Sequence, residues 1–112
     1  MPAAARPDSA PDAALEALGD ASRREILGLL AVRNRSVQEI AEELPISRPA
    51  VSRHLRVLKD AGLVAEEAVG TRRIYHLEPG GALAVRDYLE RVWGEAAVRF
   101  RLLAENTGRT DG

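Results

Sequence analysis

Residues 34–77, NRSVQEIAEELPISRPAVSRHLRVLKDAGLVAEEAVGTRRIYHL, contain the signals of two short helices, a tight turn between them and a following β-hairpin. Ser36 and Glu39 have the spacing of a capping box, in which each side chain binds a backbone N–H at a helix start. A first helix is therefore predicted over Val37 to Leu44, where apolar residues recur every three or four positions. Pro45 ends it, because proline disfavours helical geometry in the residue before it.

A second helix is predicted over residues 48–61. Ser47 is a suitable N-cap, Pro49 is tolerated in the first turn, and Gly62 is placed to end the helix as a C′ glycine. Its apolar stripe is formed by Val51, Leu55 and Leu58. Its opposite face carries Pro49, Ser52, Arg53 and Arg56, flanked by Arg48 and Lys59.

A hairpin is predicted next, because residues 63–69 and 72–77 are rich in β-forming residues and flank Gly70-Thr71. The predicted fold is therefore mainly α with a small β-hairpin, the layout of a winged helix-turn-helix. Arg72 and Arg73 lie near the hairpin tip, where they are placed to reach a phosphate backbone or a minor groove.

Positive charge is concentrated in the second helix and the hairpin. The chain has a net charge of −1, yet residues 47–73 carry six basic and three acidic side chains. A local basic face favours salt-dependent binding to double-stranded DNA, and arginine can pair with guanine in the major groove. The alternative is an ordinary solvated helix face. The predicted DNA-binding residues are Ser47, Arg48, Pro49, Ser52, Arg53, Arg56, Arg72 and Arg73.

The roles of these residues stay open at this stage. Arg53 and Arg56 suit either base reading or phosphate contact, and Ser52 suits a base edge or a phosphate. Ser47 offers the capped start of its helix to a phosphate.

The C-terminal segment, residues 81–105, has a long apolar stripe at helical spacing. Because this helix is longer than the small domain before it, we expect its stripe to pack against a second copy, with a helix over residues 12–18 beside it. The predicted dimer interface comprises Leu15, Leu18, Val85, Leu89, Val92, Trp93, Ala96, Phe100 and Leu103. A twofold dimer predicts an inverted-repeat operator with half-sites about one helical turn apart. A pocket for a small-molecule effector near this interface is an open alternative.

Length and composition predict one domain, over residues 12–105, because 112 residues with 46% apolar content suffice for a single core. Residues 1–11 and 106–112 are expected to be disordered tails. No apolar run is long enough to span a membrane, and no signal peptide is recognisable, so a cytoplasmic location is expected.

The sequence resembles the ArsR/SmtB-type winged helix-turn-helix repressors over roughly residues 13–104. The matching segments are 17–27 (ALGDASRREIL), 46–55 (ISRPAVSRHL), 58–64 (LKDAGLV) and 70–75 (GTRRIY). The resemblance implies a small homodimeric regulator that binds a palindromic operator, often near its own gene, and is displaced by a signal.

Metal sensing, the best-known property of that family, is not expected here. The chain has no cysteine, and Ser36 and Gln38 stand where metal-sensing members have a cysteine pair. The C-terminal segment has no histidine, and the spacing of His54 and His76 does not suit a ligand pair. We therefore expect no metal or other cofactor, and both histidines are predicted to be packed or hydrogen-bonded.

The alternatives from other functional classes are a protein-binding module and an enzyme. A winged helix can bind a protein instead of an operator, with the Trp93 stripe meeting a different partner. An enzyme is not expected, because no catalytic triad, phosphate-binding glycine loop or metal cluster is recognisable.

Overall fold

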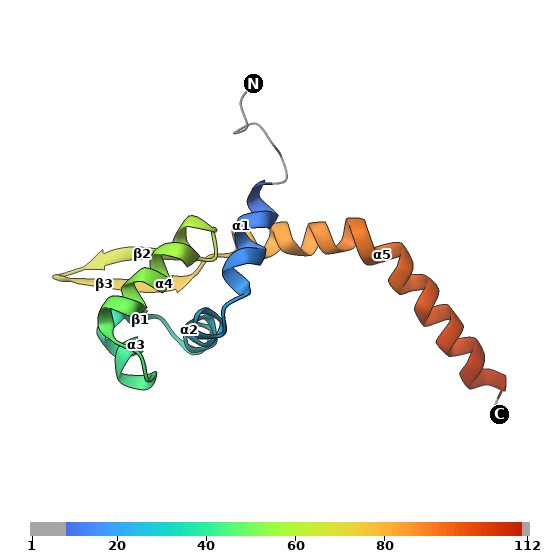
Figure 1. Ribbon diagram of the computed structural model, residues 1–112, viewed down its shortest axis with the longest axis horizontal. Helices are drawn as coiled ribbons and strands as arrows, with labels where there is room; N and C mark the ends of the chain where they lie inside the picture. Colours follow the sequence, from blue (N-terminus) through green and yellow to red (C-terminus); the bar gives the residue numbers. More distant parts are fainter. Residues whose placement is uncertain (1–8, 111–112) are drawn as a thin grey trace, which may run out of the picture.

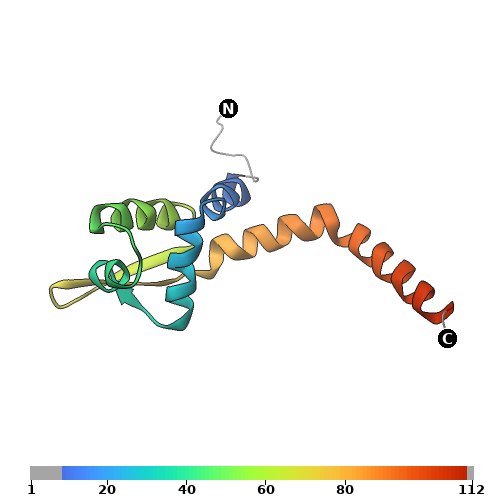
Figure 2. The same ribbon diagram turned by 60° about the horizontal axis from the view of Figure 1, so that its bottom comes forward.

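The computed structural model describes residues 9–110, which form five helices and a three-stranded sheet (Figure 1). Helices α1 to α4 and the sheet form one body, from which α5 extends (Figures 1 and 2). The elements are α1 (Ser9–Leu18), α2 (Ala21–Val32), β1 (Arg35–Ser36), α3 (Val37–Glu43), α4 (Arg48–Asp60), β2 (Val64–Val69), β3 (Arg72–Leu77) and α5 (Pro79–Thr110).

Both terminal helices are longer than the sequence predicted. Residues 9–11, expected in a tail, open α1, where Pro11 is tolerated because first-turn N–H groups lack intrahelical partners. Residues 106–110, also expected in a tail, continue α5, and no proline follows residue 105 to stop it. The rest of the two predicted tails, residues 1–8 and 111–112, lies outside the described residues.

The helix starts of the helix-turn-helix are capped as predicted. The Glu39 N–H donates to Ser36 Oγ at 3.2 Å, and the Ser36 N–H donates to Glu39 Oε1 at 2.9 Å, which completes the capping box of α3. Ser47 Oγ accepts the Ala50 N–H at 3.2 Å and caps α4. Leu44 is the C-cap of α3, so this helix is one residue shorter than predicted.

Helix α4 ends in a Schellman motif around Gly62, whose φ of 75° requires glycine. The Leu63 N–H donates to the Leu58 carbonyl at 2.9 Å, and the Gly62 N–H donates to the Lys59 carbonyl at 3.0 Å. The chain therefore reverses directly into β2, and the hairpin lies beside α4 (Figure 1).

The predicted hairpin is present, with Val69 paired to Arg72 around the Gly70-Thr71 turn. The sheet has a third strand that the sequence did not predict, since β1 pairs antiparallel with β3 through Arg35–Tyr75 and Ser36–Ile74. Two residues are too few to show a β pattern. Arg35 is nevertheless buried and forms a salt bridge with Glu43, which ties β1 to the end of α3.

The core lies between the helix-turn-helix, α2 and the hairpin, with α1 covering one side. Val51, Leu55 and Leu58 are buried on the inner face of α4, as predicted. The remaining buried apolar residues are Ala14, Ala17, Ile26, Leu30, Ile40, Ala61, Leu63 and Val64. Because the inner face of α4 is fully used, its outer face is the one presented to solvent.

Helix α5 packs along α1 at its start and then leaves the body (Figures 1 and 2). Its first turn lies against the Schellman turn, where the Gly81 N–H donates to the Gly62 carbonyl at 2.8 Å. At about 1.5 Å per residue, its 32 residues span about 48 Å.

Candidate nucleic-acid interface

The outer face of α4 is exposed and basic. Arg48, Pro49, Ser52, Arg53 and Arg56 are all exposed, as predicted for residues that meet DNA. None of these three arginines forms a salt bridge within residues 9–110. Their guanidinium groups are therefore available to base edges and phosphates.

The start of α4 lies beside a small polar pocket of about 280 Å³. The charged side chains that line it are all arginines, and its lining residues are Ser36, Val37, Gln38, Arg48, Thr71, Arg72 and Arg73. The pocket lies between the starts of α3 and α4 and the tip of the hairpin. A helix N-terminus and several guanidinium groups together suit an anion such as a phosphate.

The two arginines of the hairpin tip turn toward the body. Arg72 Nη2 donates to Ser36 Oγ at 3.1 Å and lies 3.3 Å from Glu39 Oε1. Arg73 Nη1 donates to Glu66 Oε2 at 2.9 Å. The sequence predicted that both side chains would be free to reach DNA. The structure gives each an intramolecular carboxylate: Arg72 meets Glu39 because the hairpin packs against the start of α3, and Arg73 meets Glu66 across the two strands of the hairpin.

Glu66 also accepts a hydrogen bond from Lys59 Nζ, at 2.7 Å, so it joins α4 to both strands of the hairpin. The hydrogen bonds from Lys59 and then Arg73 lower the pKa of Glu66 to about 2. The pKa of the neighbouring Tyr75 is raised, first by burial and then by the charge of Glu66. The sequence reading missed Glu66. Strand alternation, which places residues 66 and 73 on one face, was the available signal.

The two histidines lie apart on α4 and β3. Within residues 9–110, no group of three or more His, Cys, Asp or Glu side chains is arranged to hold a metal ion. His54 and His76 are both half-buried, as predicted for packed side chains. His76 Nδ1, however, is buried without a hydrogen-bond partner in the described part of the chain.

No helix of the described chain is both long enough and apolar enough to cross a membrane.

Most of the predicted dimer interface is exposed. Trp93 is 60% exposed, Phe100 74% and Leu103 66%, and all three belong to α5. The other exposed members of the predicted set are Leu15, Leu89, Val92 and Ala96. Leu18 and Val85 differ, because they pack partly against the core of their own chain. Leu83, Val98 and Leu102 are exposed on α5 as well and were not predicted.

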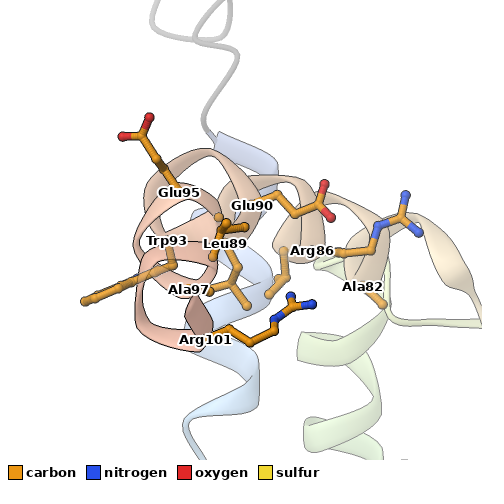
Figure 3. A pocket seen from close by; sticks show the side chains of 11 residues that line it. Ala82, Arg86, Leu89, Glu90, Trp93, Glu95, Ala97 and Arg101 are labelled. Atoms are coloured by element: carbon orange, nitrogen blue, oxygen red, sulfur yellow. The ribbon is translucent and has the colours of Figure 1, made fainter. Parts of the chain in front are cut away.

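A groove of about 810 Å³ runs along α5 where the helix bends (Figure 3). Its apolar lining residues include Val85, Leu89 and Val98, and Arg86 and Arg101 lie at its edge. The Trp93 ring extends outward from the helix (Figure 3). Monomeric proteins rarely leave so much contiguous apolar surface in water, so this face is suited to a protein partner.

Comparison with known proteins identifies the helix-turn-helix. Residues 20–66 match the family described as "Bacterial regulatory protein, arsR family". The chain is 47% identical over 98 residues to the HTH-type transcriptional regulator Rv2034 of Mycobacterium tuberculosis, covering 88% of this chain and 92% of that protein. It is 37% identical over 62 residues to the transcriptional repressor SdpR of Bacillus subtilis, covering 55% of this chain and 69% of SdpR.

A solved structure shares the architecture. The homodimeric winged helix-turn-helix DNA-binding domain of Mb0332 from Mycobacterium bovis superposes with a TM-score of 0.59 at 30% identity, covering 80% of this chain and 82% of that one. The matched regions include the helix-turn-helix, and the Rv2034 match extends over most of the chain. The chain therefore belongs to the ArsR family of helix-turn-helix transcriptional regulators, which are not enzymes.

Proposed function

We propose that the protein is a homodimeric repressor that binds an inverted-repeat operator in double-stranded DNA. The observation that carries this proposal is the outer face of α4, where Arg48, Arg53 and Arg56 are exposed without a carboxylate partner in the described chain. A helix that is buried on one face and basic on the other fits the major groove.

Contacts within a half-site follow from the position of each side chain. Arg53 and Arg56, in the middle of α4, meet base edges, and Ser52 lies beside them on the same exposed face. Ser47 and Arg48 at the helix start meet a phosphate, and Pro49 beside them packs against the backbone. Arg72 supplies the phosphate contact of the hairpin: it borders the arginine-lined pocket, and its contact with Glu39, at 3.3 Å, is longer than that of Arg73 with Glu66, at 2.9 Å, so a phosphate would displace it more readily.

Dimerisation uses the exposed face of α5. A second copy would cover Trp93, Phe100 and Leu103, and Leu15 of α1 would lie beside them. The homodimeric state of the Mb0332 domain supports this arrangement. Two recognition helices related by a twofold axis would enter major grooves about 34 Å apart, so the operator is an inverted repeat.

Repression follows from steric exclusion, since a dimer that covers a promoter prevents polymerase from binding there. The repressor function of SdpR supports this direction of regulation. A small-molecule effector would relieve repression by changing the angle at which α5 leaves the body. The apolar cavity of about 480 Å³ lined by Leu27, Leu77 and Ala82 lies at that joint.

The test is fluorescence anisotropy of the protein with a labelled duplex from its own upstream region and a scrambled duplex, at several salt concentrations. Arg53→Ala should weaken binding to the specific duplex by about 5- to 150-fold, the value of one good base contact of about 1–3 kcal/mol. Arg99→Ala is the control, because it removes an exposed arginine of α5 that pairs with Glu95. Equal affinity of the wild type for both duplexes would favour a protein-binding module.

Oligomeric state is tested separately by light scattering after gel filtration. Phe100→Glu should convert the dimer into a monomer, because it places a charge in the buried interface. Val32→Glu places the same charge at a residue that is 77% exposed on α2, so it should leave the dimer intact. A dimeric Phe100→Glu variant would remove this part of α5 from the interface.

A further inference from the structure

Glu66 occupies the junction between the recognition helix and the hairpin. Its Oε1 accepts from Lys59 Nζ in the last turn of α4, and its Oε2 accepts from Arg73 Nη1 on β3. Each carboxylate oxygen thus holds a different cation. The Glu66 side chain is only 14% exposed, whereas those of Lys59 and Arg73 are 52% and 71% exposed.

The surroundings of Glu66 differ from those of the arginine-lined pocket at the start of α4. A cavity of about 430 Å³ separates α4 from the hairpin at this point. Its charged lining residues are Arg56, Lys59, Asp60, Glu66 and Arg73. Two of these five are carboxylates, while the charged residues of the smaller pocket are all arginines. A phosphate is therefore attracted more strongly to the helix start than to the Glu66 side.

Arg73 borders both cavities, so its partner decides which of two roles it has. Bound to Glu66, Arg73 ties β3 to β2, and Lys59 on the same carboxylate ties β2 to α4. Bound to a phosphate, Arg73 would add DNA affinity without reading sequence. The pKa of Glu66 is lowered to about 2 by its hydrogen bonds with Lys59 and Arg73, so it is ionised at neutral pH. A phosphate would have to displace a mostly buried carboxylate that already binds both cations.

We propose that Glu66 is a specificity-determining residue that clamps the hairpin to the recognition helix and withholds Lys59 and Arg73 from the DNA backbone. The clamp fixes the position of the hairpin relative to α4 before DNA is bound. It also withholds two cations that would add affinity for DNA of any sequence, whereas the preset position of the hairpin favours only the fully docked operator complex. The clamp therefore lowers non-specific affinity and raises the ratio of operator affinity to non-specific affinity. This inference rests on the proposed function, and it replaces the expectation that Arg73 contacts DNA.

The test compares Glu66→Gln with Glu67→Gln in the full-length protein. Both changes raise the net charge by one, but Glu67 is exposed and forms no salt bridge in the described chain. Affinity for the operator duplex and for a scrambled duplex is measured by anisotropy over a range of salt. For each cation released to a phosphate, the slope of log affinity against log salt should steepen by about 0.9.

Glu66→Gln should therefore steepen the slope on scrambled DNA by about 0.9 to 1.8 per protomer and raise affinity for it roughly 3- to 10-fold. The ratio of operator to scrambled affinity should fall. Glu67→Gln should change these quantities much less. If the two variants behave alike, only net charge matters and the clamp is refuted. Circular dichroism of both variants checks that they are folded.

Arg73→Gln gives an independent reading. In the wild-type background it should leave the salt slope unchanged, because Arg73 is already bound to Glu66. In the Glu66→Gln background it should flatten the slope by about 0.9. Flattening in the wild-type background would show that Arg73 contacts phosphate, which overturns the inference. Equal affinity of the wild type for operator and scrambled duplexes would refute the proposed function. The clamp would still be tested in that case, because its effect on the salt slope is measured on scrambled DNA.

Discussion

Replacing Gly81 with alanine would place a methyl group where α5 meets the end of α4. A Cβ at this position lies 2.5 Å from the Ala61 carbonyl oxygen and 2.9 Å from the Gly62 carbonyl oxygen. Both atoms belong to the backbone of the Schellman turn, so neither can move aside as a flexible side chain would. The substitution therefore forces the start of α5 away from the body or distorts the turn.

The expected loss of stability is worked from these contacts. Overpacking of a well-packed site costs about 1–3 kcal/mol. Alanine at a position with an ordinary helical backbone recovers about 0.4–1 kcal/mol by restricting the unfolded chain. The net destabilisation is therefore roughly 1–2 kcal/mol, which lowers Tm by roughly 4–8 °C for a chain of this size. Thermal denaturation followed by circular dichroism at one fixed protein concentration measures it.

Substitutions at two other glycines serve as controls. At Gly80 a Cβ would meet only the Gly62 carbonyl oxygen, at 3.9 Å, which is ordinary contact. At Gly28, within α2, nothing lies within 4 Å, so alanine should stabilise the protein by up to about 1 kcal/mol through helix propensity. If Gly81→Ala proves as stable as Gly80→Ala, the close approach of α5 to the turn is not a constraint, and the reasoning fails.

Ser36→Ala should destabilise the protein by about 0.5–2 kcal/mol in urea denaturation, because it removes the N-cap of α3; Ser52→Ala, at an exposed non-capping position, should change stability little. An unaffected Ser36→Ala variant would contradict the cap. The lowered pKa of Glu66 also predicts acid sensitivity. Its salt bridges should contribute fully above pH about 4.5, its ordinary pKa, and be lost as pH falls toward 2. When pH is lowered from about 5 to about 3, the Tm of the wild type should fall further than the Tm of Glu66→Gln. Equal decreases in Tm would contradict a stabilising role of the Glu66 salt bridges.

Local sequence signals were sufficient to predict features that depend only on residues close together in the chain. The capping box at Ser36, the N-cap at Ser47 and the C′ glycine at Gly62 were predicted because each depends on residues within about one helical turn. The exposed face of α4 followed from helical periodicity in the same way. Its exposure is confirmed, and its contacts with DNA stay a prediction.

Features that depend on distant segments were not predictable in this way. Strand β1 forms because Arg35 and Ser36 complete the free edge of β3, some 40 residues later in the chain. The pairing of Arg72 with Glu39 depends on how the hairpin packs against the start of α3. Sequence spacing says which side chains share a face of one element, but not which element faces them.

The sequence by itself therefore determined the two helices of the helix-turn-helix, the hairpin after them and the two terminal helices, together with the basic face of α4. Backbone hydrogen bonding and side-chain periodicity are local and leave a pattern in the chain. Only the tertiary structure decided that Glu66 holds Lys59 and Arg73, that Gly81 has no room for a side chain, and that Val85 packs partly against the core of its own chain. These outcomes depend on close packing and charge pairing between segments that meet only after folding.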